Sequence, residues 1–210
     1  MIRLFQLYEH QLKVRPKLTN SIMTGALFGI GDVSAQLLFP SGPDTLPPSA
    51  QTNDVKRGKY DIPRTVRAVV YGSMIFSFIG DRWYRFLTKV KFSNKPAKHW
   101  SNMVLRVCVD QLGFAPLGLP FYFGCMSLLE GHGLGAAREK IKLQWWDTLK
   151  TNWCVWPLFQ MVNFSLVPLQ HRLLAANVVA IFWNTFLSYT NSQIPVGGHK
   201  LTVQYPPTVQ

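Results

Sequence analysis

Long stretches without charge limit what this chain can fold into more than any other feature of its sequence. Residues 18–39, 111–129 and 151–170 are runs of 19 to 22 residues, and Asp32 is the one charged residue that they contain. A helix of about 20 predominantly apolar residues spans the hydrocarbon core of a bilayer, which is about 30 Å thick. The sequence therefore predicts an all-α fold, a multi-pass membrane helix bundle.

Four to five hydrophobic segments are predicted within a single integral membrane domain of residues 1–210. The number is open because only 13 residues separate Arg67 from Asp81. The apolar stripe Ala137, Ile141, Trp145 and Leu149 predicts a separate amphipathic helix over 136–150, lying at the membrane interface. Residues 40–63, rich in Pro and Ser, are expected to be a flexible loop, and 191–210 a loose tail. The hydrophobic segments are 18–39, 67–80, 107–129, 152–170 and 173–190.

The charge of the chain favours an anionic partner. Lys and Arg number 22 against 10 Asp and Glu, which gives a formal net charge of +12. Only 15% of the residues are charged, and the basic ones lie in blocks between uncharged stretches. We therefore expect the partner to be a lipid bilayer with anionic lipid, and no direct binding of nucleic acid. Residues 1–17 fit a basic amphipathic helix on that surface, which we expect to be retained because no cleavage context is evident.

The stretch GALFGIGDVSAQ, from Gly25 to Gln36, could be a phosphate-binding loop or a membrane helix that carries an acid. No strand pattern precedes it, and its glycines match neither GxGxxG nor GxxxxGK, so the helix is favoured. Small residues on one helix face allow a neighbouring helix to pack closely. Asp32 lies on that face, and it would either line a polar pathway or form a structural clasp with a partner such as Arg172. That face holds Ser21, Gly25, Gly29, Asp32 and Gln36.

Polar residues recur at three- and four-residue spacing in the later segments. They could enclose a water-filled cavity, or they could hold the helices together through interhelical hydrogen bonds. The candidates for a pore or polar stripe are Asp32, Gln36, Asp110, Gln160, Asn163, Arg172 and Asn184. The prolines expected to bend the helices are Pro116, Pro120, Pro157 and Pro168.

The sequence contains no GxSxG, no HExxH and no His/Cys pair at a metal-binding spacing. We therefore expect no enzymatic activity, no metal and no cofactor. Cys108, Cys125 and Cys154 are far apart in apolar stretches, and they are expected to be small buried hydrophobic residues.

Several stretches together resemble one family of membrane proteins. The stretches begin RPKLTNSIMTG, RTVRAVVYGSM, DQLGFAPLGLP and LKTNWCVWPLF. Their combination of GD…Q, DQ…P and NWxxWPxxQxxNF…VPxxxR is similar to the family of peroxisomal membrane protein twenty-two and Mpv-seventeen, over roughly residues 8–190. Within that family, the chain resembles a stress-inducible member of the mitochondrial inner membrane.

The resemblance implies a multi-pass protein of the mitochondrial inner membrane that passes small solutes as a channel would. It also implies roles in metabolic adaptation to stress, such as heat or ethanol, and in mitochondrial DNA maintenance. The alternative is a non-transporting scaffold for an inner-membrane complex, docked through the small-residue face. A second copy of the chain, or such a complex, is the expected protein partner.

Overall fold

The computed structural model describes residues 14–39, 60–92, 99–166 and 172–192, together with single residues at 6, 10, 11, 94 and 96. Within these ranges every regular element is helical, and no strand occurs, so the all-α prediction is confirmed. In chain order the elements are α2 (Pro16–Leu38), α3 (Ile62–Val70), η3 (Tyr71–Phe76), α4 (Ser77–Lys89), α5 (Trp100–Val109), η4 (Asp110–Phe114), α6 (Ala115–Leu129), α7 (Leu134–Leu166) and α8 (Arg172–Ser192).

The π-helical segments η3 and η4 do not interrupt their helices. The backbone stays in the right-handed helical region at Val70 and Ser77, on either side of η3, and at Val109 and Ala115, on either side of η4. Consequently α3, η3 and α4 form one rod, and α5, η4 and α6 form another. Among the described residues, two stretches are long and apolar enough to cross a membrane, Pro16–Leu38 and Trp100–Leu129, which leaves the predicted number of four to five spans open.

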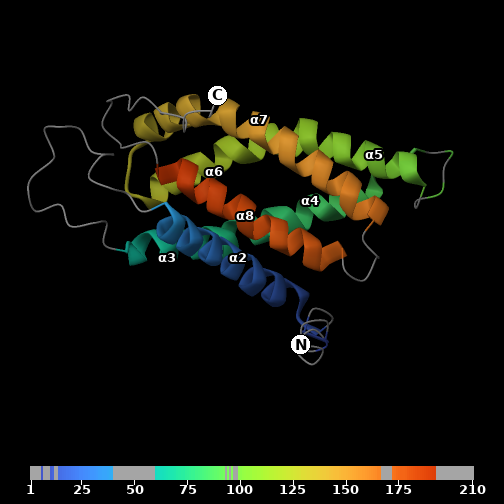
Figure 1. The fold of residues 1–210 in the computed structure, drawn as a ribbon, viewed down its shortest axis with the longest axis horizontal. Coiled ribbons are helices and arrows are strands. Elements are labelled where there is room, and N and C mark those ends of the chain that lie inside the picture. Colours follow the sequence, from blue (N-terminus) through green and yellow to red (C-terminus); the bar gives the residue numbers. More distant parts are fainter. Residues whose placement is uncertain are drawn as a thin grey trace, which may run out of the picture.

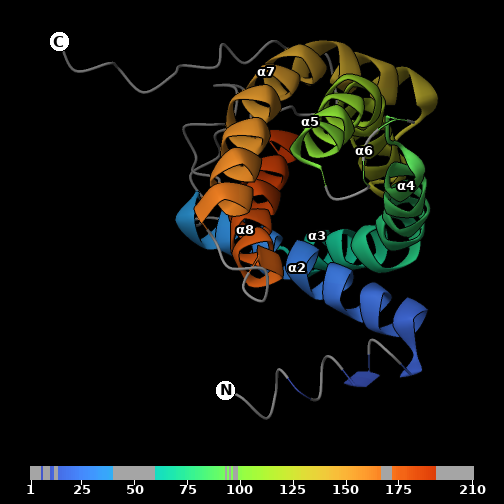
Figure 2. The same cartoon turned by 90° about the vertical axis from the view of Figure 1, so that its right-hand side faces the viewer.

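The helices follow one another around a ring when the bundle is viewed along its long axis (Figure 2). Helix α2 packs against α8 on one side and against α3 and η3 on the other, and α6 packs against α7 (Figure 1). Apolar side chains fill part of the interior. This core includes Phe28, Tyr71, Leu119, Tyr122, Phe123, Met126 and Leu149.

The prediction of a separate interfacial helix over 136–150 is wrong. Helix α7 is one helix of 33 residues that also contains the fourth hydrophobic segment, and at 1.5 Å per residue it is about 50 Å long. Ala137 and Leu149 are buried as an apolar stripe requires, but Lys140 beside them is only 2% exposed. The stripe was correctly recognised, but it faces the other helices of the bundle.

Some boundaries also differ from the prediction. The loop expected over 40–63 ends before Ile62, where α3 begins, because Asp61 caps that helix by accepting a hydrogen bond from the backbone N–H of Arg64. Helix α8 extends to Ser192, two residues into the predicted tail. The prediction that the cysteines are buried is wrong for Cys108 and Cys154, which lie on the outside of their helices, while Cys125 is half-buried.

Prolines lie inside continuous helices. Pro120 is within α6 and Pro157 within α7, and Pro116, the second residue of α6, also lies inside the continuous rod because η4 runs into α6 without a break. The fourth predicted kink, at Pro168, lies outside the described residues, as do most of residues 1–13 and the greater part of the predicted loop and tail.

Candidate functional site

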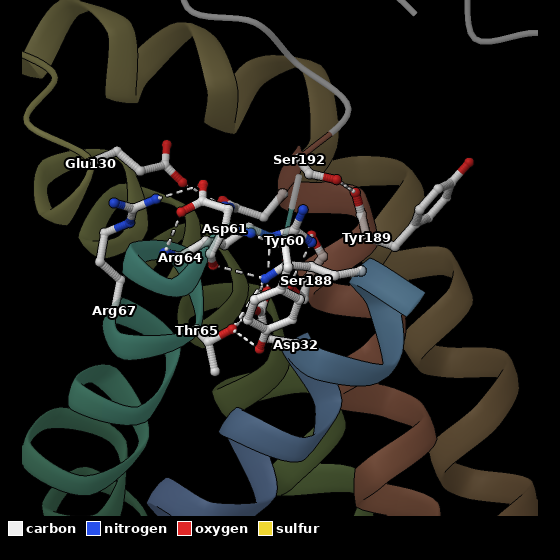
Figure 3. A network of polar contacts seen from close by, with 12 residues as sticks. Asp32, Tyr60, Asp61, Arg64, Thr65, Arg67, Glu130, Ser188, Tyr189 and Ser192 are labelled. Atoms are coloured by element: carbon white, nitrogen blue, oxygen red, sulfur yellow. Dashed lines mark hydrogen bonds and ion pairs between the residues drawn. The ribbon is translucent and has the colours of Figure 1, made fainter. Parts of the chain in front are cut away.

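A buried carboxylate lies where α2, α3 and α8 meet. Asp32 is 0% exposed, and its Oδ1 atom is 2.8 Å from Nε of Arg64, which is itself 14% exposed. Ser188 of α8 donates a hydrogen bond to the same oxygen. On the other oxygen, Thr65 donates at 2.6 Å and Gln36 at 2.8 Å (Figure 3). Both oxygens are therefore saturated with donors, one of which carries a full positive charge.

Arg64 ties this carboxylate to the third helix of the site. Its terminal nitrogen donates to the Ser188 backbone carbonyl at 3.1 Å and to the hydroxyl of the same residue at 3.0 Å. Gln36 joins α2 to the start of α3, because its side-chain oxygen accepts from the Asp61 backbone N–H at 2.7 Å and its nitrogen donates to the Asp61 carbonyl at 3.0 Å. One network, buried at Asp32 and exposed at Asp61, thus fixes the relative positions of α2, α3 and α8.

Glycines on two sides of α2 allow this close approach. A Cβ atom added to Gly25 would lie 3.0 Å from Cβ of Ser73, and one added to Gly29 would lie 2.8 Å from a methyl carbon of Val69. On the other side, a Cβ at Gly31 would lie 2.5 Å from Cβ of Asn184 and 2.8 Å from its carbonyl carbon. The small residues therefore place α2 against both α3–η3 and α8.

A second ion pair lies at the same end of the bundle. Nζ of Lys140, on α7, donates to Glu130 at 2.9 Å, and the other carboxylate oxygen of Glu130 accepts from Asn191 on α8 at 2.7 Å. Lys140 precedes the predicted membrane-spanning part of α7. Burial lowers its pKa below the ordinary value, and the carboxylate of Glu130 opposes that shift. This pair joins the end of α6 to α7 and α8.

A row of polar side chains continues from Lys140 along the inner face of α7. The row is Lys140, Gln144, Thr148 and Asn152, at steps of four, and each of the four is between 1% and 6% exposed. Buried polar atoms are normally hydrogen-bonded to protein or water. Among the described residues, however, Oε1 of Gln144, Oγ1 of Thr148, Oγ of Ser127 and Oδ1 of Asn191 have no partner. The interior between α6, α7 and α8 therefore contains polar groups that water can satisfy.

Asp110 belongs to a separate cluster. Its carboxylate accepts hydrogen bonds from the Trp83 indole at 2.8 Å and from Gln111 at 3.1 Å. Asn152 of the α7 row donates to the Gln111 side chain at 2.7 Å, and the Trp153 indole donates to the Gln111 backbone carbonyl at 2.9 Å. This cluster joins α4, η4 and α7.

The structure brings together some of the predicted site residues. Asp32 and Gln36 share one network, and Asn184 is buried beside Gly31, whereas Asp110 lies in the other cluster and the half-buried Gln160 in neither. Ser21 donates to the Ser73 carbonyl at 2.7 Å, on the predicted packing face with Gly25 and Gly29. The cation that pairs with Asp32 is Arg64 rather than the suggested Arg172. The side chains of Asn163 and Arg172 lie outside the description.

Sequence reasoning missed Arg64, Thr65 and the α7 row. The row had a visible signal, since polar residues at positions 140, 144, 148 and 152 repeat every four residues as one helix face does. Within the described part of the chain, no group of three or more His, Cys, Asp or Glu side chains is placed to hold a metal ion.

Among the described residues, two stretches are apolar enough to cross a bilayer and charged groups are paired inside the bundle, as expected of a helical membrane protein. Comparison with known proteins identifies the family to which the chain belongs. A family model described as Mpv17 / PMP22 family matches residues 127–188, which contain α7 and most of α8.

The similar proteins extend this match over the whole chain. The chain is 64% identical, over all of both chains, to a protein called Protein SYM1 from Saccharomyces cerevisiae. It is 54% identical to Protein SYM1 from Kluyveromyces lactis over 95% of each chain, and 48% identical to that of Eremothecium gossypii over 91% of this chain and 98% of the other. The chain belongs to the Mpv17/PMP22 family. No solved structure matches it.

Proposed function

We propose that this protein is a channel-like protein of the mitochondrial inner membrane that lets small solutes pass without changing them chemically. The observation that carries the proposal is the buried polar row of α7, which is Lys140, Gln144, Thr148 and Asn152. At 1.5 Å per residue, the twelve-residue distance from the first to the last of these side chains is about 18 Å, and the row ends at Asn152, where the predicted hydrophobic segment 152–170 begins.

The unpaired polar atoms beside this row support passage rather than simple helix packing. Lys140, Gln144 and Asn152 do bond to other helices. Helix packing alone would nevertheless leave few buried polar atoms without partners, because an unsatisfied buried polar group costs about 1–3 kcal/mol. The unpartnered oxygens of Gln144, Thr148, Ser127 and Asn191 come from three helices. Water between them would satisfy these atoms and offer a small solute a polar surface in place of bulk solvent.

Location and physiological role are part of the proposal and rest on the family resemblance. They are a multi-pass arrangement in the mitochondrial inner membrane and support of metabolic adaptation to heat and ethanol stress and of mitochondrial DNA maintenance. We expect transport to involve no chemistry on the solute, and therefore neither enzymatic activity nor a cofactor.

The scaffold alternative is weakened by the packing of α2. It relied on the face of Ser21, Gly25 and Gly29 to dock another protein, but that face contacts α3 and η3 of the same chain. A partner protein would have to use another surface.

Purified full-length protein in planar bilayers tests the proposal. We expect discrete steps of current. Thr148→Val should lower the unit conductance, because it removes a buried hydroxyl with almost no change in size. Thr151→Val is the matched control, since the same exchange falls on the more exposed part of α7, where the hydroxyl only donates to the Asp147 carbonyl. Absence of current at high protein load, or equal conductance in both variants, would contradict the proposal.

A further inference from the structure

A basic hollow of about 390 Å³ lies between the start of α2 and the outer face of α4. Its wall contains four cationic side chains and one carboxylate, and Phe78 and Phe86 form its apolar part. The charged residues are Lys17, Asp81, Arg82, Arg85 and Lys89. Four positive charges against one negative give the hollow a net charge of +3.

The charge is not neutralised within the described part of the chain. Arg85 bonds to the Asp81 carboxylate one turn earlier on α4. Among the described residues, no carboxylate pairs with Lys17, Arg82 or Lys89. Three exposed cations thus surround one hollow with no anion of their own.

A second hollow of about 290 Å³ adjoins the first. It is lined by Ile79, Arg82, Trp83, Phe86 and Phe114, so it shares Arg82 and Phe86 with the basic hollow and is otherwise almost entirely apolar. Phe78 and Phe86 are 44% and 49% exposed. A polar solute would gain nothing from this apolar extension, whereas a hydrocarbon chain would be shielded by it.

The position of both hollows fits the surface of a membrane. Lys17 is the second residue of α2, whose apolar part follows it, and Asp81 and Arg82 come directly after the apolar residues that end with Gly80. The basic side chains therefore gather at the level where both helices meet the headgroup region, and the apolar hollow lies next to them. Basic pockets at this level are suited to anionic headgroups.

We propose that the two hollows form one binding site for an anionic phospholipid. The phosphate lies among Lys17, Arg82 and Lys89, and an acyl chain lies along Phe86, Ile79 and Phe114. The site lies outside the bundle, and its occupation does not depend on whether the protein conducts.

Native mass spectrometry of the full chain in a non-ionic detergent tests the site. The probes are dioleoyl phosphatidylglycerol and dioleoyl phosphatidylcholine, which share acyl chains and differ in net charge. We expect the wild type to retain phosphatidylglycerol more strongly, and the double variant Arg82→Gln/Lys89→Gln to bind it roughly thirtyfold more weakly, as expected for the loss of two basic residues near an anionic lipid.

The control variant is Arg138→Gln/Lys142→Gln, which removes the same two charges from exposed positions on α7. It should bind phosphatidylglycerol as the wild type does. Circular dichroism verifies that both variants are folded. Equal weakening in the two variants, or equal retention of the two lipids by the wild type, would overturn the proposal.

A competition arm distinguishes a lipid from a free phosphate compound. Millimolar inorganic phosphate or glycerol 3-phosphate should not displace phosphatidylglycerol, because neither occupies the apolar hollow. Phe86→Ala should weaken retention of the lipid further, since Phe86 lines both hollows. Displacement by the free phosphates with no effect of Phe86→Ala would show that the site takes a soluble anion, and would overturn the lipid assignment.

Discussion

Replacement of Asp32 by Asn should destabilise the bundle through the charge that it leaves behind. The exchange preserves the size of the side chain, and one oxygen can still accept a hydrogen bond. Arg64, which is 14% exposed, would lose its counter-charge, and the new amide would face donors from Thr65 and Gln36. Removing one partner of a buried ion pair costs about 3–5 kcal/mol. We expect about 3 kcal/mol here, because Arg64 keeps some contact with its surroundings and its bonds to Ser188.

Unfolding by SDS titration in mixed micelles measures this loss, and the amount of protein in the membrane gives a second readout. At about 3 kcal/mol the ratio of folded to unfolded protein falls more than a hundredfold. The double variant Asp32→Asn/Arg64→Gln removes both charges and should be more stable than Asp32→Asn alone. As a control, Lys142→Gln breaks an exposed pair with Glu139 and should cost about 0.5 kcal/mol or less.

Two results would refute this reasoning. If Asp32→Asn unfolds at the same SDS fraction as the wild type, the network does not hold the helices together. If the double variant is no more stable than the single one, the stranded charge of Arg64 is not the cause. Normal abundance of Asp32→Asn together with a reversal potential shifted toward anions would instead identify Asp32 as part of the solute pathway.

Three further predictions follow from the packing and the charges. Gly31→Ala should destabilise the fold by about 1–3 kcal/mol, because the new methyl group meets the α8 backbone. Gly80→Ala, where the nearest contact of the added methyl group is at 3.8 Å, should be neutral or stabilising by up to about 1 kcal/mol, and equal melting temperatures of the two variants would refute this. The free energy of unfolding should rise as pH increases through the interval between the lowered pKa of Lys140 and its ordinary value of 10.5, since the unfolded chain binds more protons there than the folded one. The double variant Lys140→Gln/Glu130→Gln should lack this rise in a series of thermal melts, and an unchanged slope would disprove the prediction. Alkaline carbonate should leave the protein in the membrane pellet, and its recovery in the supernatant would contradict membrane insertion.

The fold class and one part of the site were predictable because their signals are local. The uncharged runs and the spacing of Gly25, Gly29 and Asp32 depend only on helix periodicity, so the sequence predicts that Asp32 faces protein. The identity of its partner depends on which helices pack together. Arg64 is 32 positions away and Ser188 is 156 positions away. No periodicity in the sequence indicates those pairings.

The α7 row was missed for a different reason. The apolar stripe that contains Ala137 and Leu149 suggested a helix with one buried face and a charged face in solvent. In the structure, the neighbouring row that includes Lys140 and Thr148 also faces inward, because α6 and α8 cover more of α7 than a membrane surface would. From the sequence alone, Lys140 is expected to face solvent, because nothing local in the chain indicates that Glu130 pairs with it.

The π-helical segments make two stretches of the chain tolerant of a change in length. A π-helical segment accommodates one residue more than the α-helix that would replace it. Deleting one residue within Tyr71–Phe76 would therefore let the segment close into regular α-helix, so that Trp83 stayed beside Asp110 while Arg64 kept its place at Asp32. The same deletion within α4 would instead rotate everything after it by about 100° relative to α3. In an evolving lineage, single-residue gaps would therefore be accepted more readily at these two segments than elsewhere in the same rods.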